Sequence, residues 1–170
     1  MQKRIISASQ ILPPKPKPTQ AEIRRRLAKE IKTARRWDIK GNWINWRSLR
    51  SYREATKINI LNLIRKMLKK GQVSVLDIGS GQTIALSQIK KNLSRGKKDQ
   101  VHLTGLTTVR IPAHKKAKQK GVDEIRIGRI ETIKLDRQYD LIISVQGGIA
   151  YSSEKFKAIK KAIDALKPGG

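Results

Sequence analysis

The sequence predicts an α/β fold with a doubly wound, mostly parallel sheet. Between residues 71 and 170, short apolar runs alternate with segments whose apolar residues recur at helical spacing. The first run, residues 73–78, is largely apolar on both faces, which is typical of an interior parallel strand. Gly79 and Gly81 follow it directly, where the next helix begins. Glycines at this point let the backbone adopt positive φ and let a ligand approach the main chain.

The chain before this sheet divides into a basic, proline-rich arm, residues 1–18, and a basic helical extension, residues 19–70. Thr19 and Glu22 form a capping box, which predicts the start of a helix. Basic side chains crowd this helix, and they favour an anionic partner over a surface that is merely solvated. These residues are Arg24, Arg25, Arg26, Lys29, Lys32, Arg35 and Arg36.

Three tryptophans follow, Trp37, Trp43 and Trp46, and they allow two interpretations. They could stack on exposed nucleobases, or they could dock the N-terminal helix on the domain, which is the role we expect. A second helix is predicted over residues 49–70, with Tyr52 among its apolar positions. Gly71 suits the left-handed position that commonly ends a helix.

The remaining elements alternate along the chain. Strands are expected at residues 101–106, 124–128 and 139–145, and helices at residues 84–93, 113–120 and 153–166. A polar loop, residues 94–100, joins the first of these helices to the next strand. Phe156, Ile159 and Ile163 share one face of the last helix.

Charge and composition limit the possible partners. The formal net charge is +26, and the excess is densest in the first 70 residues. Such a field attracts polyanions, so nucleic acid is the leading partner and an anionic membrane surface the second. The absence of cysteine fits a cytoplasmic, reducing compartment, although the basic N-terminus leaves an organelle-import segment open. No apolar run in the sequence is long enough to span a membrane.

The glycine segment has the pattern VLDIGSG, residues 75–81. It departs from a dinucleotide-binding fingerprint, because Ile84 stands where the third glycine belongs, and it lacks the Gly-Lys-Ser/Thr end of a P-loop. An ordinary turn in another α/β protein is the alternative. The pattern resembles motif I of the class I S-adenosylmethionine (SAM)-dependent methyltransferases. Three later segments resemble that family in the same order and spacing, namely VHLTGLT (101–107), QYDLIISVQGG (138–148) and ALKPGG (165–170).

The resemblance implies a SAM site at the end of the first strand. There, Gly79, Ser80 and Gly81 would let the main chain pass against the methionine part of the cofactor. Asp77 would order this loop and reach the polar end of SAM, directly or through water. The alternative role of Asp77 is a cap at the end of the strand.

Two positions depart from the family pattern. Thr107 stands where the family usually has an acid that accepts both ribose hydroxyls, and a hydroxyl can accept one such bond. Arg129 stands where an acid often accepts the adenine amine, and Glu131, two residues later, is expected to replace it. Both departures predict weakened SAM affinity.

The segment after the fourth predicted strand, SVQGGIAYS, is where the resemblance places the methyl acceptor. It lacks the Asn/Asp-Pro-Pro-aromatic tetrad of many amino-group methylases, which argues against that chemistry. Gln146 and Tyr151 are the side chains expected to meet a substrate. His102 and His114 are expected to be structural or solvated, and the sequence predicts no metal site.

Together, the resemblance and the charge predict a SAM-dependent methyltransferase that acts on RNA. The alternatives are a small-molecule methyltransferase and a non-catalytic RNA-binding or ribosome-associated protein that retains the fold. The resemblance implies the strand order 3-2-1-4 for residues 71–170, the SAM-binding domain. Because the family has three further strands, we expect a fragment whose fourth strand forms a bare sheet edge.

Overall fold

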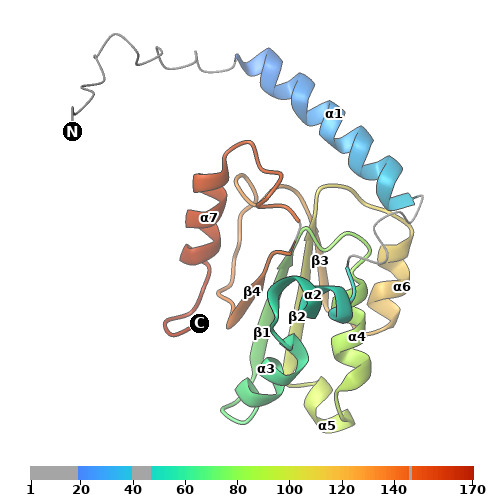
Figure 1. Ribbon diagram of the computed structural model, residues 1–170, viewed down its shortest axis with the longest axis vertical. Coiled ribbons are helices and arrows are strands. Elements are labelled where there is room, and N and C mark those ends of the chain that lie inside the picture. The colour runs from blue at the N-terminus through green and yellow to red at the C-terminus, as the bar shows by residue number, and fades with distance from the viewer. Residues whose placement is uncertain (1–18, 40–46, 146) are drawn as a thin grey trace, which may run out of the picture.

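The computed structural model describes residues 19–39, 47–145 and 147–170 of the chain, and its centre is a four-stranded parallel sheet (Figure 1). The strands are β1 (Val73–Ile78), β2 (Val101–Thr107), β3 (Glu124–Ile127) and β4 (Leu141–Ile143). Their order in the sheet is β3-β2-β1-β4. This order confirms the predicted fold class and topology.

Strand β1 is central because it pairs with a parallel neighbour on each side. Val75 lies opposite Leu103 of β2 and opposite Leu141 of β4. Along β1, side chains alternate between the two faces of the sheet, so Val75 and Asp77 point to one face while Leu76 and Ile78 point to the other. Because of this alternation, the carboxylate of Asp77 lies on the same face of the sheet as Val75.

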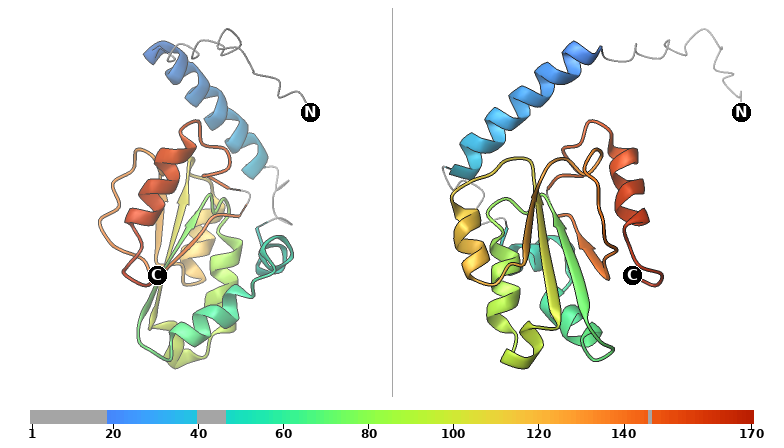
Figure 2. Two further views of the ribbon diagram at one scale, coloured as in Figure 1. Left: turned by 60° about the vertical axis from the view of Figure 1, so that its left-hand side comes forward. Right: turned by 180° about the vertical axis from the view of Figure 1, so that it is seen from behind.

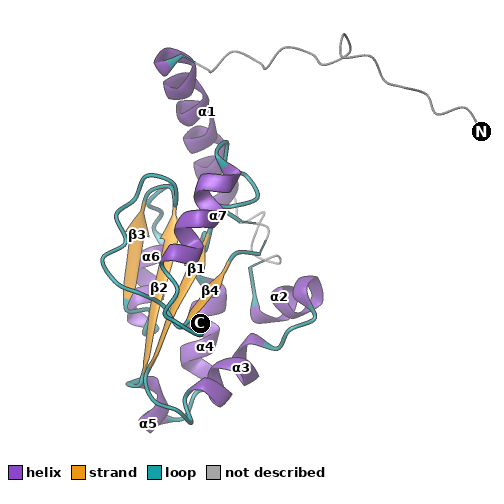
Figure 3. Cartoon of the chain, turned by 90° about the vertical axis from the view of Figure 1, so that its left-hand side faces the viewer, coloured by secondary structure: helices purple, strands orange, loops and turns teal. Residues whose placement is uncertain are grey.

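Helices cover both faces of the sheet (Figures 2 and 3). One face packs against α2 (Leu49–Thr56), α3 (Ile60–Met67), α4 (Ile84–Asn92) and α6 (Ala113–Gln119). The other face packs against α7 (Lys155–Asp164) and the connection between β3 and β4. A parallel sheet with helices on both faces is the doubly wound arrangement that the sequence predicts.

The helix predicted over residues 49–70 is instead two helices, α2 and α3. Lys57 adopts a left-handed backbone conformation, φ 61°, and its amide bonds back to the carbonyl of Arg53, which ends α2. Asn59 then caps α3 by accepting a hydrogen bond from the amide of Asn62 at 3.1 Å. The break lets both helices place buried side chains, Tyr52 and Ile64, against the same face of the sheet.

The fourth strand is shorter than the predicted residues 139–145. Tyr139 makes only an isolated bridge to Leu166, because its amide bonds to the carbonyl of Ala165 and its carbonyl accepts from Lys167. The C-terminal segment therefore occupies the backbone groups that would have extended β4. A second difference is a short helix, α5 (Arg95–Lys98), within the segment predicted to be a polar loop.

The last helix, α7, buries small side chains and exposes large ones. Its buried face consists of Ala158 and Ala162, continued by Ala165 just after the helix. Phe156, Ile159 and Ile163 do share one face, as predicted, but that face is solvent-exposed, at 91%, 43% and 61% of each residue. The large apolar residues lie about 130° around the helix from the alanines, so both sets cannot contact the sheet.

The basic helix α1 (Gln20–Ile39) runs beyond the carboxyl ends of the strands (Figures 1 and 2). Its predicted capping box is present, since the amide of Glu22 donates to Thr19 Oγ1 and the amide of Thr19 donates to Glu22 Oε2. Residues 1–18, Trp43 and Trp46 lie outside the described residues, as does the side chain of Trp37. Among the described helices, none is long and apolar enough to cross a membrane.

Candidate functional site

A crevice of about 440 Å³ opens at the carboxyl ends of the strands. Its walls come from the end of each strand and the segment that follows: Gly79 after β1, Thr107 at the end of β2, residues 128–131 after β3, and residues 147, 148, 151 and 152 after β4. Helix α1 adds Arg26, Lys29 and Thr33, and Arg47 precedes α2 at the same opening. These are the ends of a doubly wound sheet at which ligands bind.

The turn at residues 79–81 places Gly79 in the wall of this crevice, whereas Gly81 is buried and does not line it. Both glycines have the positive φ that the sequence predicts. Gly79 has φ 82° and Gly81 has φ 50°. The amides of Gly79 and Ser80 both donate to the carbonyl of Leu106, at 2.8 and 3.0 Å, which fixes the turn to the end of β2. The side chain of Ser80 is buried, and its hydroxyl donates to the same carbonyl at 3.4 Å. The Ser80 hydroxyl therefore lies beneath the turn and does not line the crevice.

Gly79 is required here by contact between two loops. A Cβ at Gly79 would collide with backbone atoms of Gly147 and Gly148, and a Cβ at Gly147 would lie 2.6 Å from the carbonyl oxygen of Ile78. The turn after β1 thus packs directly on the turn after β4. The sequence predicted that Gly79 makes room for a ligand; in the structure its missing side chain makes room for the protein's own backbone.

His114 holds the second glycine in place. It is buried at the start of α6, and its Nδ1 accepts a hydrogen bond from the amide of Ile111 at 3.3 Å. Nδ1 therefore lacks a proton in this tautomer, and Nε2 donates to the carbonyl of Gly81 at 2.7 Å. This assignment confirms a structural role for His114.

Asp77 is buried beneath the turn, on the face of the sheet that packs against α2. The hydroxyl of Tyr52 donates to both carboxylate oxygens, at 3.0 Å to Oδ2 and 3.2 Å to Oδ1. Burial raises the pKa of Asp77 to about 7, although the Tyr52 hydrogen bond and the positive charge of Arg47 both lower it. Burial likewise raises the pKa of Tyr52, and the charge of Asp77 raises it further. Asp77 is not among the residues lining the crevice.

Arg47 connects this buried pair to the crevice. It lines the opening, and its guanidinium lies so close to Gly81 that a Cβ at that glycine would overlap it. Sequence reasoning missed both Arg47 and the bonding role of Tyr52. A tyrosine among the apolar positions of a helix was the available signal, since a buried Tyr hydroxyl needs a polar partner. No pattern in the sequence singled out Arg47.

The carboxylate of Glu131 lines the crevice. It is buried after β3, and its Oε1 accepts from Arg129 Nη2 at 2.7 Å and Nε at 3.2 Å. The hydroxyl of Ser152 donates to the same oxygen. Burial raises the pKa of Glu131, but the hydrogen bonds from Ser152, from its own backbone and from Arg129 outweigh burial and hold it below the ordinary value. Glu131 is therefore a charged acceptor, and Thr107 lies buried in the same wall.

The remaining predicted site residues fall into three groups. Tyr151 lines the crevice and is largely exposed, whereas Gln146 lies outside the described residues. Of the basic residues on α1, Arg26 and Lys29 line the crevice. Exposed positions that do not line it are Arg24, Arg25, Lys32 and Arg36, while the side chain of Arg35 is outside the description. Within the described part of the chain, no group of three or more His, Cys, Asp or Glu side chains could hold a metal ion.

Comparison with known proteins finds no matching family model and no matching curated protein. Solved structures do match. A 1,6-didemethyltoxoflavin-N1-methyltransferase from Burkholderia thailandensis, with its toxoflavin precursor and S-adenosylhomocysteine bound, gives a TM-score of 0.60 at 13% identity, covering 90% of this chain and 62% of that one. The plantazolicin methyltransferase BpumL, with a pentazolic desmethylplantazolicin analogue and S-adenosylhomocysteine, gives 0.56 at 21% identity, covering 88% and 58%.

A third match is SAM-bound CalS10, an amino pentose methyltransferase from Micromonospora echinaspora, with a TM-score of 0.50 at 19% identity, covering 70% of this chain and 48% of that one. The chain therefore spans about half to three-fifths of the length of these structures. At such identities the likeness concerns the fold. The sheet order and the matches agree, and this chain has the Rossmann-like fold of the class I SAM-dependent methyltransferases.

Proposed function

We propose that this chain is the cofactor-binding core of a SAM-dependent methyltransferase and that SAM binds in the crevice at the carboxyl ends of the strands. The observation on which this proposal rests is the crevice itself, built around a glycine turn after β1 with a charged acid after β3. The neighbours support it, because they were solved with SAM or S-adenosylhomocysteine bound.

The crevice fits such a cofactor in size and in the chemistry of its walls. Its volume of about 440 Å³ is within the range of small-ligand sites. Ile78, Leu106 and Ile130 supply apolar surface suited to an aromatic ring. Glu131 supplies an ionised acceptor for a hydroxyl or amine, and Thr107 a weaker, neutral one. We assign Glu131 the acceptor role that family members give to other acids.

The chain's own contribution to the reaction would be positioning. SAM, when bound, supplies an electrophilic methyl group, which an acceptor nucleophile takes in one in-line displacement. The Gly79 turn, locked to Leu106 and to the Gly147–148 turn, would hold one wall of the crevice rigid. Tyr151, exposed at the rim, is placed to contact an acceptor entering from solvent.

For the acceptor we propose RNA. Arg26 and Lys29 bring the basic helix α1 to the mouth of the crevice, so a polyanion bound along α1 would be delivered to the site. Among the described residues, four cations line the crevice, Arg26, Lys29, Arg47 and Arg129, against the one carboxylate of Glu131. A net charge of +26 supports the same partner. Asp77 and Ser80 do not line the crevice, so in this proposal they would support the glycine turn and would not contact the ligand.

A small-molecule acceptor is the second candidate. The neighbours' acceptors are a toxoflavin precursor, plantazolicin analogues and an amino pentose, none of which is a polynucleotide. In this case the charge on α1 would serve another purpose. The two candidates differ in one measurable way, since only the first predicts methyl transfer that depends on the α1 cations.

Calorimetry with S-adenosylhomocysteine tests the cofactor. We expect binding that Gly79→Val abolishes, because its branched side chain would push the Gly147–148 turn out of the wall and strain a residue at φ 82°. The matched control is Gly96→Val on α5, where a Cβ meets no atom within 4 Å. Glu131→Gln should weaken binding about tenfold, the cost of one hydrogen bond to a charged group. Absence of binding to the wild-type chain at millimolar ligand would contradict the proposal.

Transfer of labelled methyl groups from SAM to RNA tests the acceptor. We expect the quadruple neutralisation of Arg24, Arg25, Lys32 and Arg36 to glutamine, which leaves the crevice lining intact, to lower RNA affinity and flatten its salt dependence by about 0.7 per lost phosphate contact. Affinity for S-adenosylhomocysteine should change little. Cofactor binding without RNA binding would favour the small-molecule acceptor, and RNA binding without cofactor binding would favour a non-catalytic role.

A further inference from the structure

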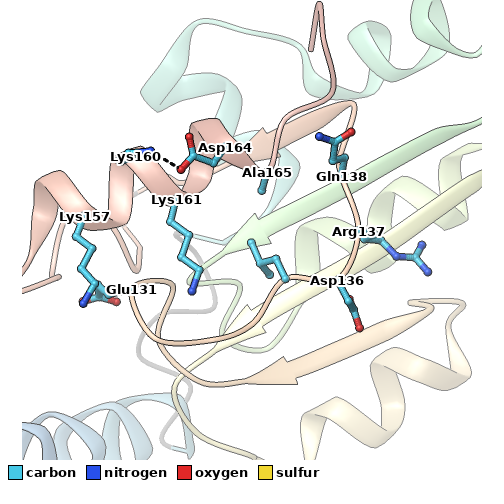
Figure 4. Close-up of a pocket in the computed structure, with 10 residues that line it drawn as sticks. Glu131, Asp136, Arg137, Gln138, Lys157, Lys160, Lys161, Asp164 and Ala165 are labelled. Atoms are coloured by element: carbon cyan, nitrogen blue, oxygen red, sulfur yellow. Dashed lines mark hydrogen bonds and ion pairs between the residues drawn. The ribbon is translucent and has the colours of Figure 1, made fainter.

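A second cavity, of about 700 Å³, lies between α7 and residues 131–138, the segment that connects β3 to β4 (Figure 4). We call it the α7 cavity. Leu135 and Ala165 provide apolar surface in it, and charged side chains provide most of the remainder. Lys157 and Lys161 extend from α7 towards the connecting segment, while Arg137 stands at the rim and points away. Nothing in the proposed methyl transfer uses these lysines.

The charges in the α7 cavity do not cancel, because its carboxylates are already paired. Glu131 pairs with Arg129 at 2.7 Å, Asp136 pairs with Arg126, and Asp164 pairs with Lys160 at 2.7 Å. Each carboxylate therefore already contacts a cation, although Arg126 also pairs with Glu124 at 2.8 Å. The cavity lining contains three further positive charges, Lys157, Lys161 and Arg137.

The two α7 lysines differ in how well they are compensated. Lys157 reaches Glu154 on the same helix at 3.5 Å, an exposed contact that salt screens readily. Lys161 is half-buried, and no carboxylate in the described part of the chain pairs with it. A half-buried ammonium without a counter-ion attracts an anion from solution, and a flexible ammonium is a common phosphate ligand.

The α7 cavity adjoins the crevice. Glu131 lines both, and its carboxylate is held in place by Arg129 and Ser152, which line the crevice. A strand with one nucleotide at the crevice would thus have neighbouring phosphates near α7. We propose that Lys161 and Lys157 bind backbone phosphates of a single-stranded RNA whose adjacent nucleotide enters the crevice. This inference rests on the RNA acceptor proposed above, and it adds a second contact surface to α1.

The test is a salt titration of the binding of a labelled single-stranded oligouridylate, followed by fluorescence anisotropy. Lys157→Gln with Lys161→Gln should flatten the slope of log K against log salt by about 1.4, since each phosphate contact on a single strand contributes about 0.7. The matched control neutralises Lys115 and Lys118, two exposed lysines of α6 on the opposite side of the sheet. We expect the control to leave the slope unchanged.

Several outcomes would overturn the inference. An unchanged slope in the α7 double variant would remove these lysines from the interface, and equal losses from the α6 pair would indicate diffuse attraction. Displacement of the oligonucleotide by millimolar inorganic phosphate at constant ionic strength would indicate a site for free anions. Failure of the wild-type chain to bind RNA would overturn both this inference and the RNA acceptor, whereas S-adenosylhomocysteine calorimetry on the same samples judges the cofactor proposal independently.

Discussion

Two buried acids lie at the carboxyl ends of β1 and β3, two strands that β2 separates, and their hydrogen-bond donors differ in charge. Asp77, at the end of β1, has a tyrosine hydroxyl as its hydrogen-bond donor. Glu131, after β3, has a guanidinium and a serine hydroxyl. Burial raises the pKa of both, yet the pKa of Asp77 ends near 7 and that of Glu131 ends below its ordinary value. Burial dominates at Asp77, whose tyrosine donor lowers the pKa only in part, whereas the serine, backbone and guanidinium donors outweigh burial at Glu131.

This difference separates two roles at one site. At neutral pH Glu131 is an anion in the wall of the crevice, available to a ligand. Asp77 is close to half-protonated there and lies outside the crevice, where it joins β1 to α2 through Tyr52. Sequence reasoning named both acids as cofactor residues. In the structure Glu131 lines the crevice and Asp77 does not.

Removing the carboxylate of Glu131 should have the largest effect on stability. Glu131→Ala leaves Arg129, which is 16% exposed, beside an empty site, and loss of one partner from a buried pair costs about 3 kcal/mol. Urea unfolding at pH 7 measures this free energy. Glu131→Gln, which keeps an acceptor oxygen, is the matched control and should cost less. Equal losses would mean that the charge of Glu131 contributes nothing to the pair.

Removing the donor to Asp77 should have the next largest effect. Tyr52→Phe leaves a buried carboxyl without that hydrogen bond, at a cost of about 2 kcal/mol. The cost should be larger at pH 8, where Asp77 is ionised, than at pH 5, where it is protonated. Tyr151→Phe, at an exposed position, serves as the control and should be neutral. A pH-independent cost would show that Tyr52 acts through packing alone.

The two acids should give opposite pH dependences of stability. Because the folded pKa of Asp77 is raised from 3.8 to about 7, its contribution is complete below about pH 4 and is lost as pH rises to about 7, at up to about 1.4 kcal/mol per pH unit. The pKa of Glu131 is lowered, so its contribution is present above about pH 4.5 and is lost in more acidic solution.

Denaturant unfolding across pH 3 to 8 separates these contributions. In the Asp77→Asn variant, the decline in the free energy of unfolding between about pH 4 and 7 should disappear, while the loss of stability below about pH 4.5 remains. In the Glu131→Gln variant, the loss of stability below about pH 4.5 should shrink, while the decline between about pH 4 and 7 remains. If Asp77→Asn retained the full decline, the titrating group would have to be another residue.

Changing Arg47 should have the smallest effect. Its positive charge lowers the pKa of Asp77, so Arg47→Gln should raise that pKa, and only slightly, because a partly exposed charge is screened by solvent. The pH at which the free energy of unfolding stops declining measures the shift in the pKa of Asp77. Arg50→Gln, on the exposed side of α2, is the control. A downward shift would contradict the electrostatic relation between Arg47 and Asp77.

The sheet was predictable from sequence because its signals are local. Apolar runs of strand length, glycines after β1 and helical spacing after Ile84 predicted the elements of a doubly wound sheet, and the resemblance to the methyltransferases implied the order β3-β2-β1-β4 that the structure shows. The break between α2 and α3 was not predictable from sequence, since Lys57 adopts a left-handed conformation that its residue type disfavours. The face that α7 presents was also hidden, because periodicity shows that Phe156 and Ile163 share a side but not that alanines occupy the contact with the sheet.

The site was predictable in position and less so in detail. Gly79, Thr107, Glu131 and Tyr151 all line the crevice, whereas Asp77, Ser80 and Gly81 do not, and their contacts with a ligand stay predictions. The reason for Gly79 could not be read from one segment, because the residues that occupy its Cβ space, Gly147 and Gly148, are almost seventy positions away. The Tyr52–Asp77 bond was hidden in the same way, since it joins elements that only folding brings together.

The central place of β1 has a consequence for how the molecule opens. Val75, Leu76 and Asp77 have a partner strand on each side, whereas Leu141 to Ile143 of β4 pair with β1 alone. Each backbone amide bonds to one neighbouring strand. The β1 amides that bond to β2 lie between two interior strands, so they should exchange late and should report the global free energy of unfolding. The amides of β4 can exchange through local separation of the edge. Isotope exchange would therefore reveal an order of release, β4 before β1, in a fold whose ligand crevice needs both.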